Sequence, residues 1–234
     1  MRSETLKAVL AARAASRPVA VVSNLDTGEQ ALVYADTVEG KLELSDGAVA
    51  SARKAIADDK SGRLPADVSG NAPLFAQVSN PAKRMVVVGA VHIAQPLVVI
   101  AQTAGYAVTI VDPRGAFATR ERFPGVDLSE DWPDDALEKL AIDTRTAVVT
   151  LTHDPKLDDP ALMVALKSPA FYIGSLGSKR THAKRIERLT EAGLNEAEIG
   201  RIHAPVGLNI GAKSPAEIAI SILAQITEVL HRAS

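Results

Sequence analysis

The chain has 234 residues, of which 47% are hydrophobic and 23% charged, and these proportions predict a folded globular protein. Its 26 Lys and Arg residues balance 28 Asp and Glu residues, and 3% of the residues are aromatic, so neither nucleic acid nor a membrane surface is an expected partner. The absence of cysteine excludes disulfides, thiolate metal ligands and Cys nucleophiles. We expect a soluble, cytoplasmic protein.

Residues 1–80 predict a small α+β unit. Apolar patterning predicts helices at 5–15 and 48–59 and strands at 18–24 and 30–35. Asp26-Thr27-Gly28 between the two strands is typical of a hairpin turn. The stretch 60–71 is rich in Ser, Gly, Pro and Asp, and it is expected to be a linker or a long loop.

Residues 81–234 alternate between apolar strands and helices. Strands are expected at 85–88, 107–111, 146–151 and 170–173, and helices at 93–103, 133–140, 160–166, 178–192 and 215–230. Runs such as MVVV, VTIV and TAVVTL are apolar on both faces, as in parallel strands that helices cover on both sides. The sequence therefore predicts an α/β protein with a Rossmann-like doubly wound parallel sheet, which binds ligands beyond the carboxyl ends of its strands.

The turn after the first of these strands matches part of a dinucleotide-binding signature. Gly89-Ala90-Val91-His92-Ile93-Ala94 occupies the place of G-x-G-x-x-G/A, but Val91 stands where the second glycine lets backbone approach a pyrophosphate. Asp112 ends the second strand, where an acidic residue binds a ribose hydroxyl, and Arg114 would suit a phosphorylated ribose. NAD(P) binding and a purely structural turn both remain open.

Two histidines follow strand ends. His92 is expected at the beginning of the first helix, and His153 follows strand 146–151. With the usual strand order the two face one crevice, where they could form an acid/base pair with Asp112 or Asp154. Neither pair has a helical metal-ligand spacing, so we predict ligand contacts and no metal site; capping or packing is the alternative.

The segment FYIGSLGSKR, residues 171–180, is the most specific local feature. A strand runs into Gly174 and Gly177, and a helix with two cations in its first turn follows. Exposed backbone N–H groups, the Ser178 hydroxyl and the Arg180 guanidinium would bind a phosphate or another oxyanion. Because cations oppose the dipole at a helix N-terminus, a bound anion would relieve that conflict. A tight turn with solvated basic side chains is the alternative.

Five segments, in this order across residues 84–230, resemble the XdhC/CoxI family of xanthine dehydrogenase accessory factors: VVVGAVHIAQ, VTIVDPRGAFATRERFPGV, VVTLTHDPKLDDPAL, FYIGSLGSKRTHAKRIERL and PVGLNIGAKSPAEIAISILAQI. The resemblance implies a Rossmann-like domain that binds the molybdenum cofactor, as molybdopterin or its cytosine dinucleotide form, and transfers it to a molybdenum hydroxylase apo-enzyme. Val91 departs from the glycine that is more common in the family, and the family's N-terminal Gly-Ser and Gly-Gly-Cys motifs are not found.

The favoured hypothesis is therefore a carrier or chaperone without catalytic residues. The residues predicted to bind its cofactor are Gly89, His92, Asp112, Arg114, His153, Gly174, Gly177, Ser178 and Arg180. The alternative is an NAD(P)-dependent oxidoreductase with His153 as its proton-transfer residue, or a nucleotide-binding sensor. The expected partner is a molybdenum hydroxylase, and self-association into a homodimer stays open.

Overall fold

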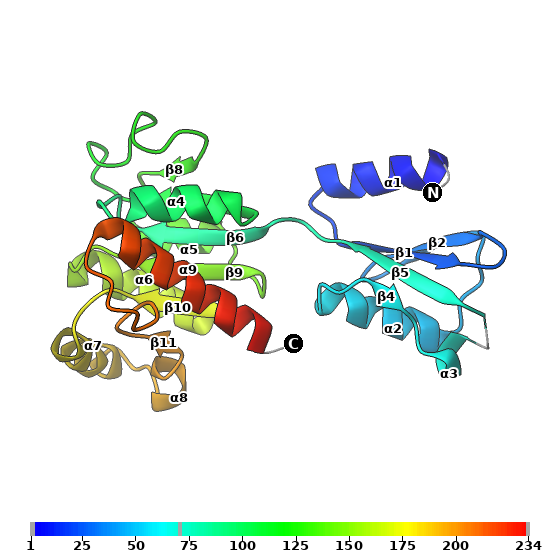
Figure 1. Ribbon diagram of the computed structural model, residues 1–234. Coiled ribbons are helices and arrows are strands. Elements are labelled where there is room, and N and C mark those ends of the chain that lie inside the picture. Colours follow the sequence, from blue (N-terminus) through cyan, green and yellow to red (C-terminus); the bar gives the residue numbers. More distant parts are fainter. Residues whose placement is uncertain (1–2, 70–71, 233–234) are drawn as a thin grey trace. The chain divides into compact units, whose positions relative to one another are not determined.

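The computed structural model describes residues 3–69 and 72–232. By its internal contacts the chain divides into two compact units, Met1–Pro81 and Ala82–Ser234 (Figure 1).

The N-terminal unit is a five-stranded antiparallel sheet with helices on both faces. Its elements are α1 (Ser3–Ala14), β1 (Val19–Asn24), β2 (Gln30–Val33), β3 (Val38–Gly40), α2 (Asp46–Ala57), β4 (Gly62–Arg63), α3 (Ala66–Ser69) and β5 (Leu74–Ser79), and the strand order is β3-β2-β1-β5-β4. Successive residues of β1 point to opposite faces. Val21 therefore packs with Val9 of α1, and Val22 packs with Ala52 of α2.

The two helices and the hairpin expected here are present, but the expected loop at 60–71 is wrong in part. Gly62 and Arg63 pair with Ala76 and Phe75 of β5, and α3 follows, while residues 70 and 71 lie outside the described residues. A two-residue strand has no period that a sequence pattern can reveal, because its pairing depends on β5.

The C-terminal unit is a doubly wound α/β domain. Its elements are β6 (Lys83–Val88), α4 (Ala94–Thr103), β7 (Tyr106–Val111), β8 (Asp127–Ser129), α5 (Pro133–Lys139), β9 (Thr146–Thr150), α6 (Pro155–Lys167), β10 (Tyr172–Ser175), α7 (Lys179–Glu191), α8 (Glu196–Ile199), β11 (Ile202–His203) and α9 (Pro215–Arg232). The parallel strands have the order β11-β10-β9-β6-β7-β8. Counted from β6 as the first strand, this is the Rossmann order, which confirms the expected fold.

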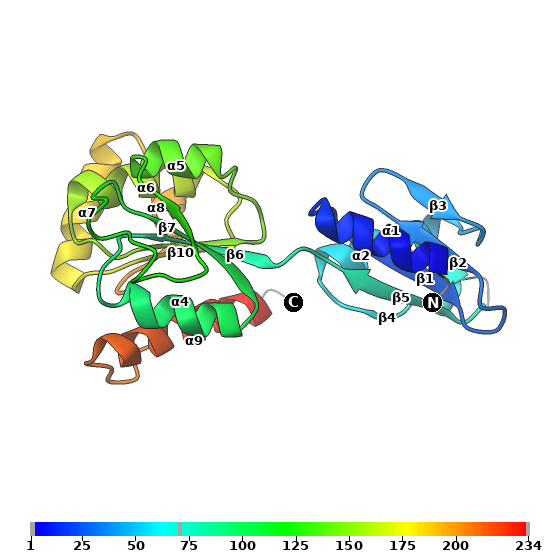
Figure 2. The ribbon, with the colours of Figure 1, turned by 90° about the horizontal axis from the view of Figure 1, so that it is seen from above.

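Helices α4 and α9 cover one face of this sheet, and α5 and α6 cover the other (Figure 2). Met85 and Val87 of β6 pack in the core beneath α4 and α9, whereas Val86 and Val88 pack in the core beneath α5 and α6. Both faces of the strand are buried, which explains its uniformly apolar sequence.

Helix α6 begins at Pro155, earlier than the expected residue 160. The Asp154 side chain accepts a hydrogen bond from the backbone N–H of Lys156 at 3.0 Å and so caps the helix, with Pro155 in its first turn. The earlier start matters for function, because it places Asp158 and Asp159 on a helix.

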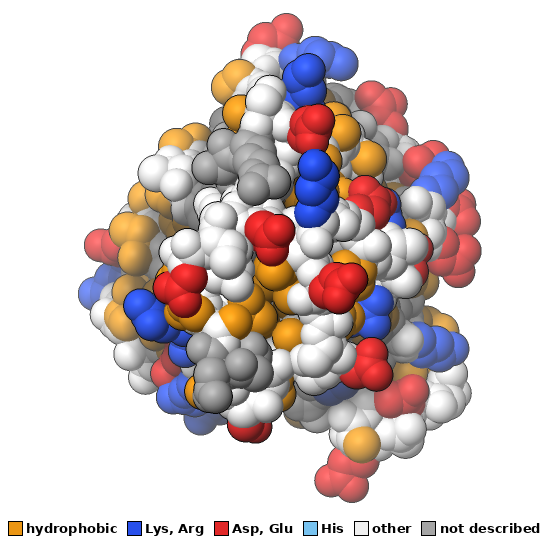
Figure 3. Space-filling model, turned by 90° about the vertical axis from the view of Figure 1, so that its right-hand side faces the viewer, with side chains coloured by type: hydrophobic (Ala, Val, Ile, Leu, Met, Phe, Trp, Pro, Cys, Tyr) orange, Lys and Arg blue, Asp and Glu red, His pale blue; other side chains and the backbone are white. Residues whose placement is uncertain are grey.

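The surface carries charges of both signs. Figure 3 shows a face on which acidic and basic side chains are interspersed with hydrophobic ones, in keeping with the formal net charge of −2. In residues 3–69 and 72–232 we find no helix whose length and hydropathy would let it span a membrane.

Candidate functional site

The carboxyl ends of the parallel strands lie along one edge of the C-terminal sheet, and the predicted site residues are distributed along it. β6 and β9 are neighbours although the chain reaches β9 only after β7 and β8, so the switch point of the fold lies between them. Two clusters occur at this edge. The first is the glycine turn, Gly89 and Ala90 with Asp112 and Arg114; the second is a pocket between α6 and α7.

The glycine turn is shaped by a close approach to the end of β9. Gly89 has a φ of +108°, and a Cβ atom there would lie 2.6 Å from Cγ2 of Thr152. Only glycine accommodates both the backbone conformation and the contact. Val91 is half-buried and packs against the hydrophobic core, so its side chain fills the place where the signature has its second glycine.

Asp112 is fully buried at the end of β7, and each of its carboxylate oxygens accepts two hydrogen bonds. Oδ2 accepts from the backbone N–H of Ala90 and from Nη2 of Arg114, both at 2.8 Å. Oδ1 accepts from the backbone N–H of Arg114 at 3.0 Å and from its Nε at 2.8 Å. Burial raises the pKa of Asp112, but these hydrogen bonds outweigh it and hold the pKa below its ordinary value.

The Arg114 side chain is the part of this cluster that faces solvent, with 41% of its surface exposed. Its guanidinium carbon lies 4.7 Å from the centre of the Phe117 ring. The hydrogen bonds to Asp112 are the main cause of the raised pKa of Arg114, and the negative charges of Asp154 and Asp158 raise it further. The glycine turn and the segment after β9 are therefore electrostatically coupled.

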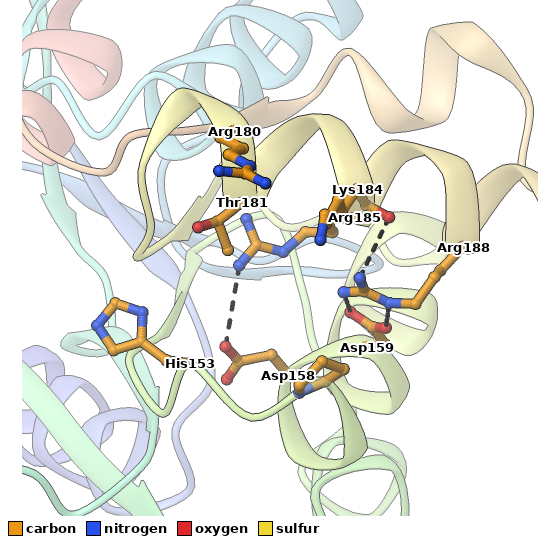
Figure 4. Close-up of a pocket in the computed structure, with 9 residues that line it drawn as sticks. His153, Asp158, Asp159, Arg180, Thr181, Lys184, Arg185 and Arg188 are labelled. Carbon is orange, nitrogen blue, oxygen red and sulfur yellow. Dashed lines mark hydrogen bonds and ion pairs between the residues drawn. The ribbon is translucent and has the colours of Figure 1, made fainter.

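The second cluster is a cavity of about 220 Å³ between the beginning of α6 and the N-terminal half of α7, which we call the α6–α7 pocket (Figure 4). The described residues that line it are His153, Pro155, Asp158, Asp159, Arg180, Thr181, Lys184, Arg185 and Arg188. Four of these side chains are cationic and two are acidic, so the pocket has a formal excess of two positive charges when His153 is neutral. Such a site favours an anion.

Arg185 is the buried cation of the pocket, and its side chain is 2% exposed. Its Nη2 donates a hydrogen bond to the backbone carbonyl of Leu176 at 2.9 Å. Its Nε and Nη1 have no hydrogen-bond partner among the described residues. Burial lowers the pKa of Arg185, and the nearby negative charges of Asp158 and Asp159 oppose that effect.

Asp158 faces Arg185 across the pocket (Figure 4). Its Oδ1 accepts hydrogen bonds from the hydroxyl of Thr152 at 2.7 Å and from the backbone N–H of the same residue at 3.3 Å. Its Oδ2 lies 3.9 Å from Nη2 of Arg185 and has no hydrogen-bond partner in the part of the chain that the structure describes. Burial raises the pKa of Asp158 above its ordinary value despite the hydrogen bonds from Thr152.

The other charged residues of the pocket divide into a closed pair and two exposed cations. Arg188 binds Asp159 through two hydrogen bonds, from Nε at 2.5 Å and from Nη2 at 3.0 Å, so these two charges compensate each other. Arg180 and Lys184 are exposed at the rim. The positive charge available to a ligand therefore comes from Arg180, Lys184 and Arg185.

The predicted phosphate turn leads into this pocket. The Ser178 hydroxyl accepts a hydrogen bond from the backbone N–H of Thr181 at 3.2 Å, so it caps α7. Gly177 has a φ of +141°, and a Cβ atom there would lie 3.0 Å from Cγ2 of Thr181. Gly174 is buried in β10, where a Cβ atom would collide with Tyr172 and Val206. These residues shape the turn, and their contact with a ligand stays a prediction.

The structure thus brings the predicted residues together in two groups. His153 and Arg180 line the α6–α7 pocket (Figure 4), and Gly177 and Ser178 directly precede α7, which forms one of its walls. The glycine-turn cluster holds Gly89, Asp112 and Arg114. His92 is exposed in the turn before α4 and does not line the pocket.

No sequence motif pointed to Asp158, Lys184 or Arg185. A signal was present, because Arg185 is four residues from Leu189, the other buried residue of α7, and therefore shares its face. Asp158 likewise adjoins Leu157 on the buried face of α6. A charged residue on an apolar helix face indicates a buried partner or a ligand. In the described residues we find no group of three or more His, Asp or Glu side chains arranged to hold a metal ion.

Known proteins resemble the chain in sequence and in structure. Residues 85–226 match the family model described as the XdhC Rossmann domain. The chain is 42% identical over 92 residues to the molybdenum cofactor insertion chaperone PaoD of Escherichia coli strain K12, covering 39% of this chain and 29% of PaoD. It is 32% identical over 160 residues to a protein of Bacillus subtilis strain 168 named as a probable xanthine dehydrogenase subunit, covering 68% of this chain and 46% of that protein.

A solved structure extends the likeness to both units. The crystal structure of a xanthine dehydrogenase from Bacillus halodurans matches with a TM-score of 0.77 and 28% identity, covering 99% of this chain and 65% of that one. The chain spans less than half the length of each of the two curated relatives. Because the family model covers more than half of the chain, the protein belongs to the XdhC family.

Proposed function

We propose that the protein is a maturation factor for a molybdenum hydroxylase of the xanthine dehydrogenase type, which binds the molybdenum cofactor and transfers it to the apo-enzyme. The observation that carries this proposal is the 42% identity to PaoD, a protein named as a molybdenum cofactor insertion chaperone. Membership of the XdhC family and the relative from Bacillus subtilis, whose name refers to xanthine dehydrogenase, support it.

The charges at the carboxyl edge of the sheet suit this ligand. The cofactor is a phosphorylated pterin, and Arg180, Lys184 and Arg185 offer the α6–α7 pocket cations for its phosphate. The unpartnered N–H groups of the buried Arg185 are donors that an anion would satisfy. When bound, the cofactor would bring the redox-active metal that the client enzyme needs. This chain's residues would bind and orient it.

Nucleotide binding in the Rossmann crevice is the alternative, in an NAD(P)-dependent oxidoreductase or a sensor. The strand order and the position of Gly89 favour it. Two observations favour the carrier instead: Val91 fills the position of the second glycine, and the carboxylate of Asp112 is already hydrogen-bonded to Arg114 and Ala90. A ribose hydroxyl would have to displace Arg114.

A parallel titration separates the two functions. The purified protein would be titrated under anaerobic conditions with molybdopterin-type cofactor, its cytosine dinucleotide form, NADH and NADPH, while calorimetry and heat stability are recorded. We expect selective stabilisation by a pterin form, and the stronger of the two identifies the natural cofactor. Selective stabilisation by NADH or NADPH would contradict the carrier and support the alternative.

A transfer assay then tests the maturation role. The loaded protein is mixed with cofactor-free molybdenum hydroxylase, and the turnover gained by the hydroxylase is compared with that from the same amount of free cofactor. We expect faster and more complete activation by the loaded protein. Equal activation would mean that the protein releases the cofactor without assisting its insertion, and weaker activation would mean that it stores the cofactor without delivering it. Light scattering on the protein alone tests whether it self-associates into a homodimer.

A further inference from the structure

We propose that the α6–α7 pocket binds one phosphate or pyrophosphate group, which replaces Asp158 as the partner of Arg185. That the molybdenum cofactor is the source of this group rests on the function proposed above. The predicted phosphate site was the turn at residues 174–180. In the structure that site also includes side chains from two helices, among them Asp158, Lys184 and Arg185.

Arg185 has buried hydrogen-bond donors that no described residue accepts. A guanidinium has five N–H donors, and buried donors are nearly always hydrogen-bonded. Arg185 is 2% exposed, yet its Nε and Nη1 lack a hydrogen-bond partner among the described residues, and the side chain lines a cavity. An oxyanion accepts hydrogen bonds from two guanidinium nitrogens at once, which makes it a matching ligand.

Arg185 and Asp158 face each other without forming a hydrogen bond. Their nearest charged atoms are 3.9 Å apart, beyond hydrogen-bonding distance, although both side chains are 2% exposed. Asp158 is held in place from its other side, because Oδ1 accepts a hydrogen bond from the Thr152 hydroxyl. The carboxylate therefore balances the charge of Arg185 without occupying its donors.

The side chains that line the pocket have an excess of positive charge. Arg188 and Asp159 form a closed pair, and Asp158 balances one further cation. The two positive charges that remain match a phosphate monoester, which carries about −1.5 to −2 charges at pH 7. The pocket also lies at the first turns of α7, a helix of 13 residues whose dipole adds to the attraction for an anion.

The volume of the pocket limits the size of the group that it can enclose. The pocket measures about 220 Å³, below the roughly 300–1,000 Å³ of cavities that enclose drug-sized ligands. It therefore suits one phosphoryl or pyrophosphoryl group and not a whole pterin or nucleotide. The rest of such a ligand would lie outside the pocket.

The test uses the full chain with inorganic phosphate and pyrophosphate, at constant ionic strength maintained with chloride. Binding is followed by calorimetry and by the rise in melting temperature. We expect saturable binding at one site, and about five- to tenfold weaker binding in Lys184→Ala, which loses a charged hydrogen-bond donor. Lys179→Ala is the matched control, because Lys179 is an exposed cation on the same helix that does not line the pocket. It should change affinity by less than about twofold.

Asp158→Asn is the decisive variant. It has nearly the shape of Asp158, and its amide oxygen can still accept from Thr152, but it removes the negative charge that competes with the ligand for Arg185. We expect about five- to tenfold tighter phosphate binding and a larger phosphate-dependent rise in melting temperature than in the parent. A merely structural role of Asp158 would not produce tighter binding.

Several outcomes would overturn the proposal: no saturable phosphate binding, equal effects of Lys184→Ala and Lys179→Ala, or unchanged or weaker binding in Asp158→Asn. Adding the pterin cofactor identifies the source of the phosphate, because a cofactor whose phosphate occupies the pocket must compete with inorganic phosphate. If inorganic phosphate does not weaken cofactor binding, the pocket does not bind the phosphate of the cofactor, but the proposed function stands. Phosphate binding without any cofactor binding would remove the proposed function and leave the pocket.

Discussion

Arg114 binds Asp112 with two parallel hydrogen bonds of 2.8 Å, Nε to Oδ1 and Nη2 to Oδ2, although only one residue separates them in the chain. The same carboxylate accepts a hydrogen bond from the backbone N–H of Ala90. Asp112 therefore ties the glycine turn after β6 to the end of β7, and a residue expected to contact a ribose has a structural role as well.

The first prediction concerns the stability that Asp112 provides. Asp112→Asn should lower the free energy of unfolding by about 2–3 kcal/mol, because an amide group would face the N–H donors of Arg114 or Ala90. The loss should be smaller than the 3–5 kcal/mol of a fully buried pair, because Arg114 is 41% exposed. Urea unfolding at pH 7 measures it. The exposed Asp127→Asn is the control and should stay within about 0.5 kcal/mol of the parent.

The second prediction follows from the lowered pKa of Asp112. A carboxyl whose pKa is lower in the folded protein adds stability above its unfolded pKa of about 3.9, and this stability is lost as the pH falls through the folded pKa. The stability difference between the parent and Asp112→Asn should therefore be full at pH 6 and shrink below about pH 4. Urea unfolding between pH 6 and pH 2.5 tests this. A constant difference over that range would show that ionisation of Asp112 contributes nothing.

The third prediction separates steric contact from backbone strain at Gly89. Gly89→Ala should destabilise the protein by about 2–4 kcal/mol, because a positive φ costs a non-glycine residue about 1–2 kcal/mol and the new Cβ would also collide with Thr152. Gly105→Ala is the matched control, since Gly105 has a φ of +87° and no atom lies within 4 Å of a Cβ there. Gly105→Ala should lose only the roughly 1–2 kcal/mol that the positive φ costs. Equal losses of stability in thermal unfolding would mean that Thr152 moves aside at no cost.

The fourth prediction concerns Arg180. Arg180→Ala should weaken retention of the molybdenum cofactor about tenfold, because it removes one charge-assisted hydrogen bond at the rim of the pocket, while the melting temperature stays unchanged. Molybdenum content after gel filtration, together with calorimetry, measures the effect. Arg120→Ala, at an exposed position that does not line the pocket, should retain the cofactor like the parent. Equal retention by all three proteins would remove Arg180 from the site.

The fifth prediction concerns a partly buried hydrogen-bond network at β10. The Tyr172 hydroxyl donates to Oε1 of Gln225 at 2.6 Å, and the same atom accepts from the backbone N–H of Gly207 at 2.8 Å. Tyr172→Phe should cost about 1 kcal/mol of unfolding free energy, because Gln225 keeps its second donor. Gln225→Leu should cost about 2–3 kcal/mol, because it leaves both the hydroxyl of the buried Tyr172 and the N–H of the half-buried Gly207 unpaired. Chemical denaturation measures both, and a smaller loss in Gln225→Leu would contradict the network.

The parallel sheet was predictable because its local signals and its tertiary environment agree. MVVV is apolar at every position and TAVVTL has apolar residues on both faces, which suits a strand covered on both sides, and β6 and β9 are such strands. The Ser178 hydroxyl caps α7 through a local hydrogen bond, so the beginning of the helix expected at residue 178 depends on neighbouring residues alone. The short strands β4 and β11 could not be predicted, since two residues have no period and depend on a neighbour for pairing.

The site was only partly predictable for a related reason. His153 and Arg180 lie beside glycines and strand ends, where sequence motifs direct attention. Arg185 and Asp158 lie inside helices, and their importance depends on their facing each other from different helices at 3.9 Å. The role of Asp112 required knowledge of the Arg114 side-chain conformation, which no spacing rule provides.

The strand order has a consequence for how the protein is made. β6 is the first strand of its sheet to be synthesised, but its neighbour β9 and both helices of the α6–α7 pocket come from later parts of the chain. The glycine turn and β7 are synthesised well before Arg185, the last of the three cations that are available to a ligand. A nascent or truncated chain therefore lacks the pocket, and anion capture must wait until most of the C-terminal unit has been synthesised.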